Sequence, residues 1–196
     1  MDGFTLVTRA DEIPGWFSNE EADAIARACP PEGILVEIGT WMGRSTAMLA
    51  ERLPNVRIFT VDSYPETAAA RKYAQDGGHP TGDPAGHAAA NLAAYPNVHR
   101  MLQNSIEAAK TWSGPCVPVD VLFVDGEHQR EQIENELRAW RLYVPAGGWI
   151  FLHDGKNSGQ WAAEVVPAAA AVLVPPEWER VPEAEAESLL AYRRRG

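Results

Sequence analysis

A short apolar run that leads into a turn with two glycines constrains the fold of this chain more than any other feature. Residues 34–38 form the run, Gly39 and Gly43 bracket the turn, and residues 44–52 carry apolar side chains at helical spacing. A continuous apolar run is typical of a strand that is buried on both faces of a parallel sheet. The segment therefore predicts a strand, a tight turn and a helix, which is the repeating unit of an α/β fold.

The same turn predicts a site for a small ligand. Glycines let a ligand approach the backbone, and the first turn of the following helix offers free N–H groups. Glu37 lies at the end of the predicted strand, where a carboxylate calls for a positively charged partner. The spacing Glu-x-Gly-x-x-x-Gly lacks the middle glycine of a dinucleotide site, so NAD is the least favoured ligand.

Strand-like and helix-like segments alternate along the rest of the chain. This alternation predicts one α/β domain over residues 1–196, with a Rossmann-like, doubly wound and mostly parallel seven-stranded sheet. We expect residues 1–30 to form a helical cap, residues 64–90 a lid-like insertion, and the last two strands an antiparallel hairpin. The predicted strands are 34–38, 56–61, 98–102, 119–124, 149–152, 178–181 and 188–192, and the predicted helices are 19–29, 44–52, 66–74, 87–95, 106–112, 129–142 and 159–173.

A second acidic residue follows the second predicted strand. Asp62 lies about 20 residues after the glycines, where an acid can accept hydrogen bonds from both ribose hydroxyls of a nucleotide. The glycine turn together with Asp62 resembles the cofactor motifs of class I S-adenosylmethionine-dependent methyltransferases. The resemblance implies that Glu37 meets the cationic amino end of this cofactor. The implied cofactor-binding residues are Glu37, Gly39, Thr40, Trp41, Gly43, Ser45, Asp62, Ser63, Asn104, Ser105 and Asp125.

Two more carboxylates follow the fourth and fifth predicted strands. Asp125 ends the fourth strand and Asp154 follows the fifth. The carboxyl ends of parallel strands form the binding crevice, and neighbouring strands lie roughly 5 Å apart. Asp125 and Asp154 are therefore candidate ligands for a hard cation such as Mg²⁺, which prefers oxygen ligands.

This part of the chain also resembles one branch of small-molecule O-methyltransferases. Asp125-Gly-Glu-His128, a helix, Gly-Gly, a strand and then His153-Asp154 match the pattern of macrocin- and cephalosporin-pathway enzymes. Catechol-type relatives place an amide or acid directly after the second carboxylate, and this chain has Gly155 there. The departure leaves two candidate ligands, so we expect Mg²⁺ to be optional.

A hydroxyl acceptor needs a base to remove its proton, and imidazole serves this purpose near neutral pH. His128 is the first choice for the base because it lies within the predicted crevice, beside Asp125. His153 is the alternative, but it alternates with Asp154 and is expected to point away from the cavity.

Bulk properties exclude several partners. The formal net charge of −10 argues against a nucleic-acid substrate, which would need a basic patch. No apolar run approaches membrane-spanning length, so we expect no membrane partner and a cytoplasmic location. The sequence does not decide between a monomer and a homodimer.

Together these features predict an S-adenosylmethionine-dependent methyltransferase that methylates a hydroxyl of a small molecule, such as a sugar or a phenolic metabolite. Two alternatives stay open. One is a metal-assisted enzyme of the cephalosporin-hydroxylase type on the same frame, because fold does not fix chemistry. The other is a protein that binds the cofactor without catalysis.

Overall fold

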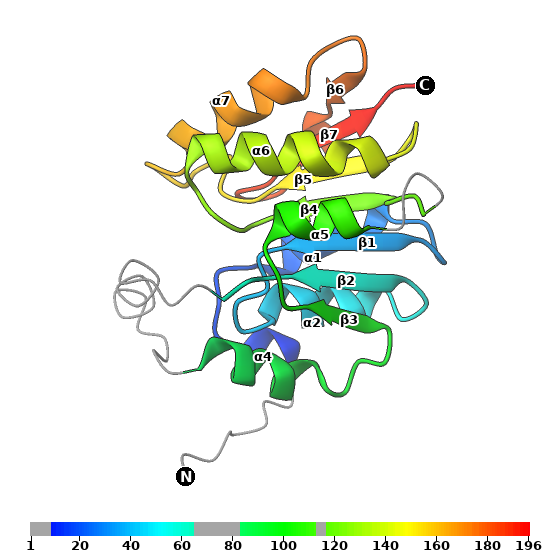
Figure 1. Cartoon of the computed structure of the whole chain (residues 1–196), viewed down its shortest axis with the longest axis vertical. Coiled ribbons are helices and arrows are strands. Elements are labelled where there is room, and N and C mark those ends of the chain that lie inside the picture. Colours follow the sequence, from blue (N-terminus) through cyan, green and yellow to red (C-terminus); the bar gives the residue numbers. More distant parts are fainter. Residues whose placement is uncertain (1–8, 65–82, 113–116) are drawn as a thin grey trace.

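The protein folds into a seven-stranded sheet with helices on both faces (Figure 1). The computed structural model describes residues 9–64, 83–112 and 117–196. The helix predicted at 66–74 and most of the lid-like insertion at 64–90 lie outside these residues.

The order of the strands in the sheet is β3-β2-β1-β4-β5-β7-β6. Strands β1 to β5 run parallel to one another, and β7 pairs antiparallel with both β5 and β6. The predicted doubly wound sheet with an antiparallel end is therefore confirmed. The strands are β1 (Ile34–Ile38), β2 (Arg57–Val61), β3 (Val98–Met101), β4 (Val121–Val124), β5 (Trp149–Leu152), β6 (Trp178–Arg180) and β7 (Leu190–Arg194).

Two groups of helices cover the sheet. The helices are α1 (Asn19–Ala28), α2 (Arg44–Arg52), α4 (Pro84–Leu92), α5 (Ser105–Thr111), α6 (Arg130–Trp140) and α7 (Ala162–Val172). Residues of α5, α6 and α7 share one apolar core with the sheet, and residues of α1, α2 and α4 share the other. Figure 1 shows α5, α6 and α7 on the near side of the strands. None of the helices in the described ranges has the length and apolar character that a membrane span requires.

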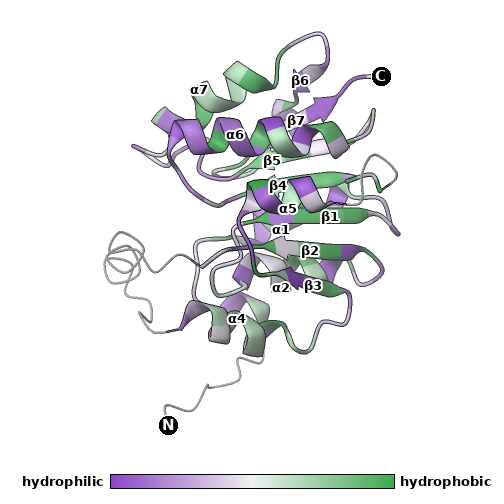
Figure 2. Ribbon diagram, in the orientation of Figure 1, coloured by the Kyte–Doolittle hydropathy of each residue, from purple (hydrophilic) through white to green (hydrophobic). Residues whose placement is uncertain are grey.

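The pattern of apolar residues explains this layering. Every side chain of β1 is buried, and successive side chains point to opposite faces of the sheet. Val36 therefore packs into the core beneath α5 and α6, whereas Leu35 packs into the core beneath α1 and α2. The central strands are coloured as hydrophobic over most of their length in Figure 2, as expected for strands covered on both faces.

Most of the predicted boundaries differ from the observed ones by one to three residues, and two of these differences have a clear cause. Helix α4 begins at Pro84, three residues before the predicted start, because Asp83 caps it and proline suits the first helical turn. Strand β7 begins at Leu190 and not at residue 188, because the backbone N–H and the hydroxyl of Ser188 both donate to Glu21.

The strand order places a crevice at one end of the sheet. The chain runs outward from β1 through β2 to β3 and then returns to place β4 on the other side of β1. Ligands of open α/β sheets bind at such a reversal, beyond the carboxyl ends of the strands. The turn after β1 and the residues that follow β2, β4 and β5 meet there.

Candidate functional site

The glycine turn after β1 holds two neighbouring strand ends together. Gly39 has a φ of +94°, and a Cβ at this position would lie 2.1 Å from the backbone oxygen of Asp125. Only glycine tolerates both this conformation and this approach. Gly43, with a φ of +85°, occupies the N-cap position of α2. The two glycines thus bring the turn against the end of β4 and start the following helix.

Asp62 fastens the same turn to the end of β2. Its Oδ2 accepts hydrogen bonds from the backbone N–H groups of Thr40 (3.0 Å) and Trp41 (2.9 Å), and its Oδ1 accepts one from Tyr64 (2.7 Å). A carboxylate has about four acceptor positions, and donors among the described residues fill three of them, which leaves roughly one for a ligand. Asp62 therefore fits a ribose hydroxyl, but contact with both hydroxyls would require it to release or share a backbone partner.

Glu37 lies beneath the turn and is fully buried. Its Oε1 accepts a hydrogen bond from Ser45 Oγ (2.5 Å), and its Oε2 accepts from Thr60 Oγ1 (2.6 Å) and from the Thr46 hydroxyl. The carboxylate thus joins β1 to β2 and to the first turn of α2. Direct contact with the cationic end of a cofactor stays a prediction, because the carboxylate faces these hydroxyls.

Burial raises the pKa of Glu37 to about 7, although the three hydroxyls partly oppose this shift. A raised folded-state pKa stabilises the protein below the unfolded-state pKa, and the contribution is lost as the pH rises towards 7. The shift corresponds to about 3 kcal/mol at 1.36 kcal/mol per pKa unit.

We therefore expect the free energy of unfolding of Glu37→Gln to increase relative to that of the wild type by about 2–3 kcal/mol as the pH rises from 5 to 8. The reason is that glutamine does not ionise, whereas Glu37 must ionise in a buried position. Urea unfolding of the cofactor-free protein at several pH values measures this difference. Glu32→Gln, an exposed change before β1, is the control and should follow the wild-type curve. Parallel curves for Glu37→Gln and the wild type would contradict the shift.

Three of the residues predicted to bind the cofactor follow β2 and β3 in the chain. Asn104 is the N-cap of α5, and its side chain accepts from the backbone N–H groups of Ile106 and Glu107. Ser105 is buried and donates to Glu136 Oε1 at 2.6 Å. Ser63 is exposed just after β2. Asn104 thus caps α5, and the Ser105 hydroxyl faces the interior.

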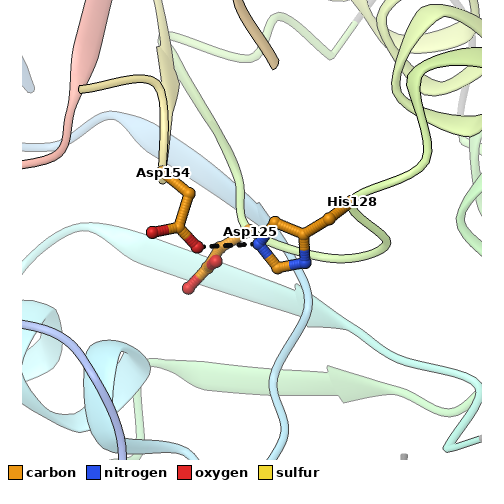
Figure 3. Close-up of side chains that lie close together, drawn as sticks. All are labelled: Asp125, His128 and Asp154. Carbon is orange, nitrogen blue, oxygen red and sulfur yellow. Dashed lines mark hydrogen bonds and ion pairs between the residues drawn. The ribbon is translucent and has the colours of Figure 1, made fainter. Parts of the chain in front are cut away.

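Asp125, His128 and Asp154 come together at the ends of β4 and β5, as the sequence predicts (Figure 3). His128 Nε2 lies 2.8 Å from Asp154 Oδ2. Asp154 has a φ of +57°, a conformation that aspartate tolerates better than most residues and that recurs at functional sites. The His128 ring also packs against Trp161, with 4.7 Å between ring centroids. No sequence motif indicated that Trp161 would lie at this site.

The charges of this cluster depend on one another. Burial alone would raise the pKa of Asp154, but contacts with His128 and His153 hold it well below its ordinary value. Burial alone would lower the pKa of His128, whereas Asp154 and Asp125 raise it to a net value above the ordinary one. An ionised Asp154 therefore orients and stabilises the His128 ring.

The sequence suggested that His153 points away from this cluster, but its ring lies buried beneath the cluster. Its Nδ1 lies 3.2 Å from Asp125 Oδ1 and 3.3 Å from Asp154 Oδ2. Its Nε2 lies 3.5 Å from Oε1 of Glu21, a residue of α1. Sequence reasoning missed Glu21 because its capping box with Ser18 already explains it locally.

The residues present do not fit Mg²⁺. Asp125, His128 and Asp154 offer one ligand atom each within 4.8 Å, but only two of the three are oxygens. The third oxygen ligand cannot come from position 155, because a Cβ on Gly155 would lie 2.3 Å from Leu190 Cγ. The His153 ring lies against both carboxylates. Imidazole nitrogens of His128 and His153 thus lie against the two carboxylates that the sequence predicts as Mg²⁺ ligands.

Several known proteins resemble this chain. The R132 protein of Acanthamoeba polyphaga mimivirus is 33% identical over 55 residues, which cover 28% of this chain and 24% of the viral protein. The chain thus matches about a quarter of that relative's length. The structure of CalS11, a calicheamicin methyltransferase described as a TDP-rhamnose 3′-O-methyltransferase, has a TM-score of 0.63 and 18% identity, over 89% of this chain and 77% of CalS11.

An rRNA methylase from Streptococcus thermophilus has a similar fold, with a TM-score of 0.60 and 12% identity, over 89% of this chain and 94% of the methylase. At these identities the structures show a shared fold only. A family model described as a methyltransferase domain matches residues 36–155, from the middle of β1 to the residue after Asp154. This match spans more than half of the chain and includes the glycine turn, Asp62 and the Asp125–His128–Asp154 cluster. The chain therefore belongs to the methyltransferase-domain family.

Proposed function

We propose that this protein uses S-adenosylmethionine to methylate a hydroxyl group of a small molecule. When bound, the cofactor supplies a methyl group on a positively charged sulfur. The chain then has to hold the cofactor, align the acceptor and remove the proton of its hydroxyl. The cofactor part of the proposal rests on membership of the family and on the open acceptor position of Asp62 in the crevice.

The contact between His128 and Asp154 carries the assignment of hydroxyl chemistry. A proton on His128 Nε2 is the arrangement that the 2.8 Å contact with an ionised Asp154 favours, and it leaves a lone pair on Nδ1. Nδ1 can then accept the proton of an acceptor hydroxyl, while Asp154 stabilises the imidazolium that forms. A histidine held by a carboxylate is a recurrent general base for hydroxyl groups. The side chain is 18% exposed, so an acceptor can reach its edge.

A small acceptor is favoured over RNA, although an rRNA methylase shares the fold. The chain has 27 acidic and only 17 basic Lys and Arg residues, and a nucleic-acid substrate would be repelled by this balance. CalS11, whose described acceptor is a nucleotide-linked sugar, shows that this fold accommodates a small molecule. We therefore place hydroxyls of sugars and phenols first among the acceptors.

A direct test incubates the purified protein with S-adenosylmethionine and a panel of nucleotide sugars, simple phenols and catechols. Mass spectrometry then follows S-adenosylhomocysteine and products heavier by one methylene group. Matched formation of both for any hydroxyl compound supports the proposal. Methylation of RNA fragments alone, with no product from the small molecules, would refute it.

Asp62→Ala is expected to weaken the binding of S-adenosylhomocysteine by at least tenfold. The change removes a charged acceptor for ribose, worth about 1.5–3 kcal/mol, and each 1.4 kcal/mol is a factor of ten in affinity. The change also removes the acceptor of the backbone N–H groups of Thr40 and Trp41. Isothermal titration calorimetry measures the affinity.

Asp120→Ala is the matched control for this change. Asp120 Oδ2 also accepts a backbone N–H from a neighbouring strand, that of Ile34 at 2.8 Å, but at the opposite end of the sheet. Both variants should lose stability, and only Asp62→Ala should lose affinity. Equal affinities in the two variants would show that Asp62 supports the turn and does not bind the cofactor.

A further inference from the structure

Three carboxylates surround one buried imidazole beneath the site. The His153 side chain is 5% exposed, and Asp125, Asp154 and Glu21 each place an oxygen within 3.5 Å of a ring nitrogen. The ring nitrogens make no well-aligned hydrogen bond with these oxygens. The attraction is therefore mainly between opposite charges, as it would be around a bound cation.

The ring is held in this position from several directions. Phe123 of β4 and Phe17, which precedes α1, pack near the ring at centroid distances of 6.3 Å and 6.1 Å. Glu21 is itself fixed, because its Oε2 accepts from the backbone N–H of Ser18 at 2.9 Å and its Oε1 accepts from Ser188 Oγ at 2.6 Å. The imidazole cannot withdraw to admit a metal ion without breaking these contacts.

The charges around the ring require a cation. Burial alone would raise the pKa of Glu21, but His153 and Ser188 lower it to about 2, so its carboxylate is ionised at neutral pH. Glu21 is buried and Asp125 and Asp154 are partly buried, so carboxylates this close together are stabilised by a positive charge between them.

We propose that the His153 ring takes the place of a divalent cation between Asp125 and Asp154, so that this site works without a metal ion. His153 and Glu21 are then positioning residues: Glu21 holds His153, His153 holds Asp154, and Asp154 orients His128. The activity arm of the test below rests on the proposed function, whereas its metal-binding arm does not.

Replacing the ring with an oxygen ligand should create the metal site that the wild type lacks. His153→Glu places a third carboxylate beside Asp125 and Asp154, and three carboxylates with water ligands suit Mg²⁺. We expect the melting temperature of His153→Glu to rise by roughly 5 °C or more at saturating MgCl₂. The wild type and His99→Glu, a change at an exposed histidine of β3, should not respond.

Thermal unfolding and calorimetry with MgCl₂, MnCl₂ and ZnCl₂ test the metal-binding arm. No shift for the wild type together with a Mg²⁺-dependent shift for His153→Glu supports the proposal. A stoichiometric heat and a raised melting temperature for the wild type with any of these ions would overturn it. If His153→Glu does not fold without metal, refolding from urea is compared with and without MgCl₂. Mg²⁺-dependent refolding supports the proposal, and equal refolding yields count against it.

The activity arm separates this proposal from the proposed function. Wild-type methyl transfer that is unchanged in excess EDTA supports both. Transfer that is lost in EDTA and restored by Mg²⁺ overturns the metal-free site and leaves the methyltransferase assignment intact. Without any transfer the proposed function fails, and the metal-binding arm still decides the role of His153.

Discussion

His128→Ala is expected to lower the rate of methyl transfer by about 10²–10⁴-fold, which is the usual effect of removing a general base. The loss should appear in kcat, while the affinity for S-adenosylhomocysteine stays close to that of the wild type. The reason is that His128 meets the acceptor hydroxyl and is not among the cofactor contacts. Single-turnover rates with saturating cofactor measure the effect.

His99→Ala is the control for the loss of a histidine. His99 is exposed on β3 and packs against Phe59, with 4.9 Å between ring centroids. Its removal should leave the rate unchanged. If His128→Ala were as active as His99→Ala, the cluster of Asp125, His128 and Asp154 would be structural and the base would lie elsewhere.

Gly39→Ala is expected to destabilise the protein by about 3 kcal/mol or more. The new Cβ would lie 2.1 Å from the Asp125 backbone oxygen, and the positive φ adds strain of its own. Relief requires β1 and β4 to separate at their carboxyl ends, because the obstacle is backbone and cannot rotate away. Urea unfolding monitored by circular dichroism gives the free energy of unfolding.

Gly159→Ala separates the two causes. Gly159 also has a positive φ, of +56°, but a Cβ there would meet no atom within 4 Å. Its replacement should therefore cost only the conformational penalty of about 1–2 kcal/mol. Equal losses in the two variants would mean that the contact with Asp125 contributes nothing, and that the strand ends are less closely packed than the structure indicates.

The sequence predicted most of the fold because its strands are covered on both faces. Buried parallel strands read as continuous apolar runs, and the residues that follow them reach one end of the sheet. This reasoning placed Asp125, His128 and Asp154 together correctly. It also located the glycine turn and the antiparallel end of the sheet.

The parts that the sequence did not predict involve residues with a sufficient local explanation. Glu21 belongs to a capping box, so nothing suggested that it also contacts His153 and Ser188. Two other differences between the predicted and the observed structure could have been predicted from the sequence. Glu37 shares a face of β1 with Leu35, which pointed it towards the hydroxyls at the start of α2. Asp83 followed by Pro84 is a helix start, but the surrounding glycines and prolines favoured a loop.

The contact between Glu21 and Ser188 joins positions 167 residues apart and has a consequence for the order of folding. Contacts between distant positions tend to form late, because the chain between them must first be brought together. The support beneath His128 is therefore expected to be complete only when β7 has docked against β5. A partly folded chain would hold Glu21 without its Ser188 partner, and fraying of this side of the sheet would loosen the support of His153 before the central strands separate.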